Sequence, residues 1–250
     1  MTKTILLLNN NPFTVKMFQL FIEANCKEIN HVFVFPFQTG KNSTFKQWLF
    51  FFNLYGFFGS FVKATKLFRQ KFVEKKFKSI FDLLEQKNIQ YTIATSPSEK
   101  CVIDYIQNAH PDVVFCALPQ IVPNEILNAP KIGTFNKHSS LLPSYRGVYP
   151  VFWQMLNHEK LLGISVHKME EKIDKGHIVF QKSFDRDMNA SFDENYDFII
   201  EQTSDVLNQA YQLIKKEHFK PIIPTSKGSY YGFPSQKDIA RFKRMRLKII

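Results

Sequence analysis

Short apolar runs alternate along the first half of the chain with stretches in which apolar residues recur every three or four positions. The runs predict strands at residues 5–8, 31–35, 91–94, 113–118 and 132–135. Helical spacing predicts helices over 14–24 and 99–110, the second with Val102, Tyr105 and Ile106 as its inner face. Strands that alternate with helices indicate an α/β fold: an open, mostly parallel, Rossmann-like sheet with helices on both faces.

The second half continues with a short helix over 149–156 and two strands at 162–169 and 177–184. Ser191 and Glu194 then form a candidate capping box, which begins a long amphipathic helix that ends near residue 217. We divide the chain into a catalytic α/β domain, 1–190, and a C-terminal helix with a small extension, 191–250. The extension is expected to be a hairpin or a dimerisation element.

Residues 48–62, WLFFFNLYGFFGSFV, are dense in phenylalanine, and residues 63–78 after them are strongly basic. The apolar stretch is interrupted by Asn53, Gly56 and Gly59 and is too short to span a bilayer. Its spacing fits a buried helical hairpin or a dimer surface. Aromatic residues beside a basic flank also suit an element that lies on a membrane surface.

Composition adds two constraints. The 250 residues carry a formal net charge of +11, which favours an anionic partner but selects no particular one. Cys26, Cys101 and Cys116 lie in or beside apolar runs without zinc-type spacing, so they predict reduced thiols and no metal site. The apolar N-terminal run is too short for a signal peptide, so we expect a cytoplasmic protein with no transmembrane segment.

The candidate chemistry lies between residues 136 and 176. Asn136 and His138 are two positions apart at a strand end, so their side chains share a face. Asp174, beside Gly176, follows the strand at 162–169. Each residue alone is ordinary: a core histidine, a turn-forming asparagine, a solvated aspartate. Together, an amide, an imidazole and a carboxylate predict a site for acyl transfer.

The segment 136–147, NKHSSLLPSYRG, resembles the Asn-x-His-x-Ser-Leu-Leu-Pro signature of formyltransferases that use 10-formyltetrahydrofolate. Residues 173–176, IDKG, resemble the Asp-x-Gly element of the same family. The resemblance implies that 10-formyltetrahydrofolate is the co-substrate. Asn136 would donate a hydrogen bond to the developing oxyanion, His138 would handle protons, and Asp174 would orient His138 or accept a proton.

The resemblance also implies binding residues on both sides of these three. The residues expected to hold the folate are Gln120, Ile121, Val122, Pro123, Leu142 and Ile173. Those expected at the acceptor are Ser139, Tyr145, Arg146, Tyr149 and Trp153, although Tyr149 and Trp153 are equally expected to serve only in packing. His167, near the end of the strand that leads to the Asp174 loop, could face the same cleft, but it has no motif behind it and is expected to be structural.

The acceptor is inferred by elimination among the branches of that family. Asparagines, not glycines, follow the first strand, which disfavours NAD, ATP and the glycinamide ribotide branch. Residues 221–250 are too few for the barrel with which the methionyl-tRNA branch grips tRNA. The remaining branch formylates a nucleotide-linked amino-deoxysugar, such as a dTDP-sugar, for surface polysaccharide (O-antigen of lipopolysaccharide), as a homodimer without nucleic acid. Two alternatives stay open: a tRNA-directed enzyme without the barrel, and a non-catalytic scaffold that binds partners through residues 48–62.

Overall fold

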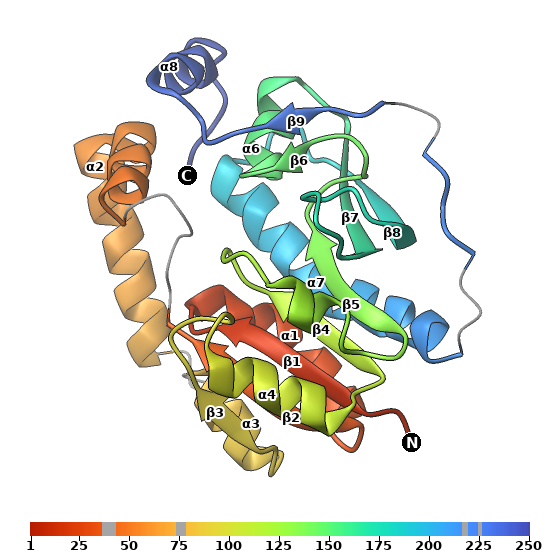
Figure 1. Ribbon diagram of the computed structural model, residues 1–250. Coiled ribbons are helices and arrows are strands. Elements are labelled where there is room, and N and C mark those ends of the chain that lie inside the picture. The colour runs from red at the N-terminus through yellow and green to blue at the C-terminus, as the bar shows by residue number, and fades with distance from the viewer. Residues whose placement is uncertain (37–43, 74–78, 217–219, 225–226) are drawn as a thin grey trace.

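The computed structural model describes residues 1–36, 44–73, 79–216, 220–224 and 227–250. Their largest sheet has seven strands in the order β3-β2-β1-β4-β5-β7-β8 (Figure 1). The strands from β3 to β5 are parallel, and β7 and β8 are antiparallel to their neighbours. Their bounds are Thr4–Asn9 (β1), Ile29–Phe35 (β2), Tyr91–Ile93 (β3), Val113–Ala117 (β4), Gly133–His138 (β5), Leu161–Lys168 (β7) and Ile178–Asp185 (β8). The predicted fold class, an open and mostly parallel α/β sheet, is confirmed.

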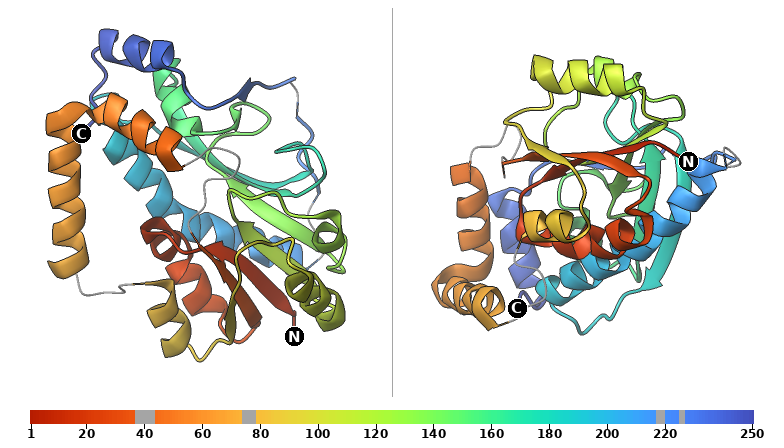
Figure 2. Two further views of the ribbon diagram at one scale, coloured as in Figure 1. Left: turned by 60° about the vertical axis from the view of Figure 1, so that its left-hand side comes forward. Right: turned by 90° about the horizontal axis from the view of Figure 1, so that it is seen from below.

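Helices cover both faces of this sheet (Figure 2). Their bounds are Pro12–Asn25 (α1), Thr44–Val73 (α2), Ile80–Gln86 (α3), Lys100–Ala109 (α4), Asn124–Leu127 (α5), Pro150–Leu156 (α6), Phe192–Lys215 (α7) and Gln236–Arg244 (α8). One face packs against α1 and α7, and the other against α4 and α5. The central strand β1 is therefore buried along its whole length, as its continuous apolar run predicts.

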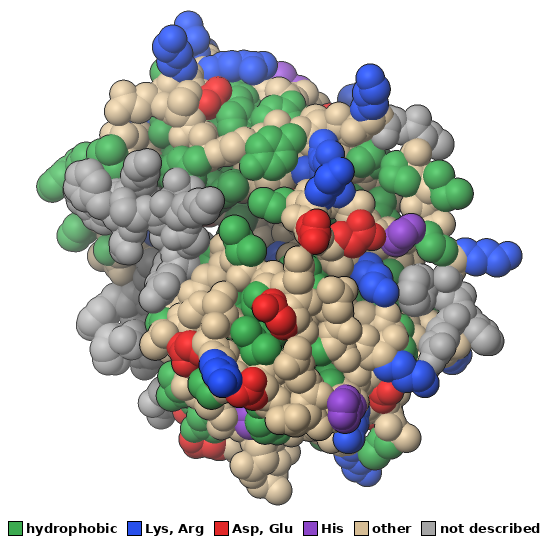
Figure 3. All heavy atoms as spheres, in the orientation of Figure 1, with side chains coloured by type: hydrophobic (Ala, Val, Ile, Leu, Met, Phe, Trp, Pro, Cys, Tyr) green, Lys and Arg blue, Asp and Glu red, His purple; other side chains and the backbone are tan. Residues whose placement is uncertain are grey.

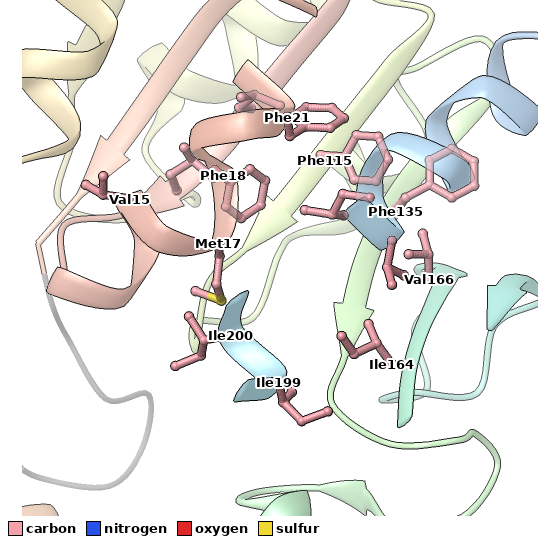
Figure 4. Close-up of a cluster of buried hydrophobic side chains, with 14 of the residues drawn as sticks. Val15, Met17, Phe18, Phe21, Phe115, Phe135, Ile164, Val166, Ile199 and Ile200 are labelled. Carbon is pink, nitrogen blue, oxygen red and sulfur yellow. The ribbon is translucent and has the colours of Figure 1, made fainter. Parts of the chain in front are cut away.

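The larger core lies between α1, α7 and the sheet (Figure 4). Phe21 of α1 meets Phe115 and Tyr211 edge to face, each with its ring centre 5.4 Å away. The predicted capping box is present, because the Ser191 hydroxyl accepts from the backbone of Glu194 and the Glu194 side chain accepts from Ser191. α7 thus begins at a fixed point, close to the carboxyl end of the sheet.

Tyr105 differs from its predicted place on the inner face of α4. Val102 and Ile106 are fully buried, whereas Tyr105 is 42% exposed. Its ring packs beside His31, with ring centres 4.5 Å apart, and so covers the edge of the sheet near β2. The inner face of α4 is narrower than the spacing suggested, because the short strand β3 leaves that edge open.

The aromatic segment forms α2, two helical stretches joined at Gly56, whose φ of 69° and ψ of −178° are not helical. Before the kink, Phe50 and Leu54 are buried in the main core. After it, Phe57 and Phe58 are 83% and 78% exposed. Burial as predicted is found for Phe50 and Leu54, whereas a buried hairpin is wrong for the exposed phenylalanines after Gly56, and the alternative of a dimer surface stays a prediction. No helix in the described ranges is apolar over the length that crossing a bilayer would take.

The C-terminal part contains a pairing that the sequence pattern did not reveal. β9 (Tyr230–Tyr231) forms a two-stranded parallel sheet with β6 (Arg146–Gly147), next to the signature segment. A side chain at Gly147 would clash, since its Cβ would lie 2.2 Å from the carbonyl oxygen of Tyr231. After β9, α8 returns to α2, and Lys243 Nζ donates to the carbonyl of Asn53 at 2.6 Å. Residues far apart in the chain therefore enclose one end of the sheet.

Candidate functional site

A cavity of about 1280 Å³ opens at the carboxyl ends of the parallel strands. This edge is where open α/β sheets hold their ligands. Asn136, His138 and Asp174 all line the cavity. The structure therefore brings together the three residues predicted to carry the chemistry, from β5 and from the loop between β7 and β8.

Asn136 and His138 lie within β5 and not beyond its end. The Asn136 carbonyl Oδ1 accepts from the backbone N–H of Lys137 at 2.8 Å, which leaves its amide nitrogen Nδ2 to donate. His138 Nε2 lies 2.7 Å from the carbonyl oxygen of Tyr145. A carbonyl only accepts, so Nε2 carries the hydrogen and Nδ1 of the neutral ring keeps its lone pair. Nδ1 is the nitrogen that can take up a proton.

Asp174 faces this nitrogen. Its Oδ2 accepts from the backbone N–H of Gly147 at 2.9 Å and lies 3.7 Å from His138 Nδ1. The residue has a φ of 51°, an uncommon left-handed conformation for a residue other than glycine. Two positions later the chain passes so close to β7 that a Cβ on Gly176 would lie 1.8 Å from the carbonyl oxygen of Lys168. This tight turn holds the carboxylate toward β5.

His167, which the sequence interpretation left as structural, lies beside the site. It is 2% exposed, pairs in register with Asn136 across β5 and β7, and presents Nε2 at 3.6 Å from Asp174 Oδ1. Its Nδ1 lies 3.0 Å from the carbonyl oxygen of Lys168, so Nδ1 carries the hydrogen. Nε2 is buried and, within the described residues, has no hydrogen-bond partner. The place of His167 near a strand end allowed it to face the cleft, and the register of β7 against β5 shows that it does.

Asp174 therefore lies between two unprotonated ring nitrogens. Burial lowers the pKa of His138, the charge of Asp174 raises it, and the nearby Lys137 lowers it. Burial likewise lowers the pKa of His167, and Asp174 again opposes the effect. Near neutral pH both rings are neutral, yet a carboxylate is in place to stabilise a proton on either one. Such a cluster can accept a proton during a reaction and pass it on.

Four of the six residues predicted for the donor side line the cavity, and their role in binding the donor stays a prediction. Gln120, Ile121, Val122 and Ile173 line the cavity, and Ile121 and Ile173 are 68% and 60% exposed. Two large apolar side chains exposed in a largely apolar cleft suit a flat ring system. The other two predicted residues lie outside the cavity lining: Pro123 precedes α5, and Leu142 is buried.

The predicted acceptor residues separate into two groups. Ser139 and Tyr149 line the cavity. The others, Tyr145, Arg146 and Trp153, are not in its lining and lie against the C-terminal strand instead. Tyr145 and Trp153 stack on Tyr231, with ring centres 5.3 and 4.7 Å away, and Arg146 pairs with Tyr230 in the β6–β9 sheet.

α2 forms a wall of the cavity that the sequence did not predict. Phe51, Phe52 and Tyr55 of this helix line it. The Tyr55 hydroxyl donates to Oδ1 of the buried Asp193 at 2.5 Å, and Lys63 Nζ donates to Oδ2 at 2.6 Å. Burial and the adjoining carboxylate raise the pKa of Tyr55 well above its ordinary value. This polar contact attaches α2 to the first turn of α7.

A family model described as formyl transferase matches residues 65–211. The bifunctional polymyxin resistance protein ArnA of Wigglesworthia glossinidia brevipalpis is 35% identical over 130 residues, 52% of this chain and 20% of that protein. A methionyl-tRNA formyltransferase of Clostridioides difficile is 34% identical over 136 residues, 54% of this chain and 44% of that protein. The chain thus spans less than half the length of these curated relatives.

Two solved structures share the fold over nearly the whole chain. A sugar N-formyltransferase from a Shewanella species has a TM-score of 0.59 at 18% identity, covering 92% of this chain and 76% of its own. A second, the sugar 3N-formyltransferase WlaRD, has a TM-score of 0.59 at 20% identity, covering 100% and 83%. At these identities the likeness shows the fold alone.

Proposed function

Because the chain belongs to the formyltransferase family, we propose that it moves the formyl group of 10-formyltetrahydrofolate to the amine of a nucleotide-linked amino-deoxysugar. The observation that carries the proposal is the shared cavity of Asn136, His138 and Asp174, which has an apolar rim on one side and an aromatic wall on the other. We assign catalysis to residues 1–190, and we assign a part of the acceptor's wall to residues 191–250.

The roles of the three residues follow from the side-chain atoms that the hydrogen bonds above leave available. Nδ2 of Asn136 donates to the formyl oxygen, which gains negative charge as the amine attacks. Nδ1 of His138 takes the proton that the amine loses, and Asp174 stabilises the positive ring that results. The proton then goes to the nitrogen that departs from the formyl carbon. His167, on the other side of Asp174, keeps the carboxylate oriented.

The donor is assigned to the side of the cavity formed by residues 118–122 and by Ile173. Ile121 and Ile173 would hold a flat pterin ring between their exposed side chains, and the backbone beside Gln120 would supply hydrogen bonds to its edge. Bound there, the folate supplies the activated one-carbon group. The solved structure of WlaRD, which has this fold, was determined in the presence of dTDP and 5-N-formyl-tetrahydrofolate.

The acceptor is assigned to the other side, where Ser139 and Tyr149 face the α2 wall. Aromatic rings such as Phe51 and Tyr149 offer stacking surfaces for a nucleotide base. A cytoplasmic location fits both substrates, and the product would serve surface polysaccharide synthesis. The predicted homodimer stays a prediction.

The test is an assay of the purified protein with 10-formyltetrahydrofolate and a panel of amino-sugar nucleotides, with charged initiator tRNA as a competing acceptor. We expect one amino-sugar nucleotide to gain the mass of a formyl group, and His138→Asn to abolish that gain. Formylation of tRNA alone would reject the sugar acceptor in favour of the activity named for the Clostridioides relative. Turnover of neither acceptor would reject the enzyme assignment and favour a scaffold.

A further inference from the structure

Three phenylalanines just after the kink in α2 have little cover. Phe57, Phe58 and Phe61 are 83%, 78% and 64% exposed. Their spacing of one, three and four residues places them in one stripe along the helix that follows Gly56. Single exposed apolar residues are ordinary, but a contiguous aromatic stripe marks a surface that binds something.

A cationic segment adjoins the stripe. Residues 235–250 contain six basic residues and one acidic residue, Asp238, whose carboxylate accepts from the backbone N–H of the N-cap residue Ser235 at the start of α8. The six are exposed: Lys237, Arg241, Lys243, Arg244, Arg246 and Lys248. Within the described part of the chain, none of the six lies within ion-pair distance of a carboxylate. No carboxylate in that part of the chain neutralises their charge, although Lys243 and Arg241 donate to the backbone carbonyls of Asn53 and Leu156.

The stripe and the cations lie on neighbouring elements. Lys243 Nζ binds the Asn53 carbonyl, and the Ile250 side chain reaches Gly59, where an added Cβ would lie 2.9 Å from its Cδ1. The same proximity is visible in the ribbon, where α8 lies next to the kinked end of α2 (Figure 1). In the space-filling view, basic side chains gather over α8 and hydrophobic ones over α2 at the same corner (Figure 3). We call Phe57, Phe58, Phe61 and the six cations the α2–α8 surface.

We propose that the α2–α8 surface docks the protein onto a lipid bilayer that contains anionic lipids. Aromatic rings enter the head-group region, and lysine and arginine side chains meet lipid phosphates at the same depth. Charge complementarity favours this occupant, because six cations beside exposed aromatic rings suit a surface that is both negatively charged and apolar. The contact is peripheral, since α2 is kinked at Gly56 and would lie along the interface.

A second copy of the chain fits the same surface poorly. In a two-fold dimer the same patch meets itself, so six cations of one copy would face six of the other, with one Asp238 on each side. Like charges at that distance oppose association. A bilayer supplies both the apolar layer for the rings and the negative charge for α8.

Docking would also position the catalytic cavity. Phe51, Phe52 and Tyr55, on the same helix, form part of the cavity wall. A bilayer against Phe57 and Phe58 would therefore lie within a few turns of the place where the acceptor is proposed to bind. The docking inference does not depend on which acceptor is formylated, because it rests on other residues.

The test is co-sedimentation of the full chain with vesicles of phosphatidylcholine alone or mixed equally with phosphatidylglycerol. We expect binding to the anionic vesicles only, weakening as salt is added. The combined change Phe57→Ser, Phe58→Ser and Phe61→Ser should lower the partition coefficient at least about tenfold. As a control, serine replaces two exposed apolar residues elsewhere on the chain, Ile93 and Leu20, and the partition coefficient should stay unaltered.

A set of charge reversals tests the cationic part of the α2–α8 surface. Lys237→Glu, Arg244→Glu and Lys248→Glu together should lower binding by at least about a hundredfold, because each lost cation near an anionic surface contributes roughly a factor of five and each new carboxylate is repelled. The control reverses three exposed lysines on other elements, at positions 16, 100 and 160, and should have a much smaller effect. Unchanged thermal unfolding and solution formyl transfer show that each variant is folded.

Four outcomes overturn the proposal: no binding to anionic vesicles, equal binding to neutral vesicles, full binding by either variant, or equal losses in the controls. If the wild type sediments as a dimer, the phenylalanine variant sediments as a monomer, and neither binds vesicles, the occupant is a second copy of the chain. Loss of formyl transfer in the His138→Asn variant with vesicle binding intact would separate docking from catalysis.

Discussion

Replacing Asp174 by Asn removes one negative charge while keeping the size of the side chain. The carboxylate lies 3.7 Å from His138 Nδ1, the atom proposed to take a proton during the reaction. At that separation, with an effective dielectric constant of about 20, a full charge on the ring gains roughly 4 kcal/mol. The transition state carries part of that charge, so we expect a loss of roughly 3 kcal/mol, about a hundredfold in kcat/KM.

The pH dependence gives a second readout for the same variant. Burial lowers the pKa of His138 and Asp174 raises it, so removing the carboxylate lowers that pKa further. The acid limb of kcat/KM, where His138 becomes protonated and inactive as a base, should therefore move to lower pH in Asp174→Asn. A merely structural role for Asp174 would reduce activity without moving the limb.

The assay is formyl transfer measured as kcat/KM between pH 5 and 9, for the wild type, Asp174→Asn and the control Asp205→Asn. Asp205 pairs with Lys182 and is half exposed on α7, so its variant should match the wild type. A near-wild-type rate in Asp174→Asn, or an acid limb that stays in place or moves to higher pH, would refute the proposed role of the carboxylate.

Three further predictions concern stability and the loops of the site. Burial lowers the folded-state pKa of His138 and His167, so the unfolded chain binds more protons below about pH 6.5. The melting temperature should therefore fall as pH is lowered from 7 to 5, and a melting temperature that stays flat or rises would contradict this. Gly176→Ala should destabilise the fold by at least ~2 kcal/mol in denaturant titration, because its Cβ would lie 1.8 Å from a backbone oxygen, whereas Gly232→Ala, with open space, should be neutral. Tyr55→Phe should cost about 1–2 kcal/mol in the same titration, since it deprives the buried carboxylate in the first turn of α7 of a hydrogen bond, and an unchanged midpoint would show that α2 is held otherwise.

The sheet could be predicted from the sequence because its signal is local. Continuous apolar runs such as residues 5–8 become strands that are buried on both faces, and Asn136 and His138 share a face because side chains alternate along a strand. The start of α7 was predicted for the same reason, since a capping box spans four residues.

The rest depends on contacts between distant parts of the chain. His167 enters the site only because β7 pairs with β5 in one register, and a shift of one residue would point it away. The β6–β9 pairing involves two residues on each strand, too few for a hydrophobic pattern. Tyr145 and Trp153 follow the signature closely in sequence, yet they stack on Tyr231, which lies about eighty residues further along.

The pairing of β9 with β6 has a consequence for the order in which the protein is made. Tyr230 and Phe233 complete the cavity wall, but they are synthesised some sixty residues after Asp174. A nascent chain can therefore assemble the sheet and the three reacting side chains while one side of the pocket is still absent. Productive turnover should begin only when β9 has emerged from the ribosome and paired with β6.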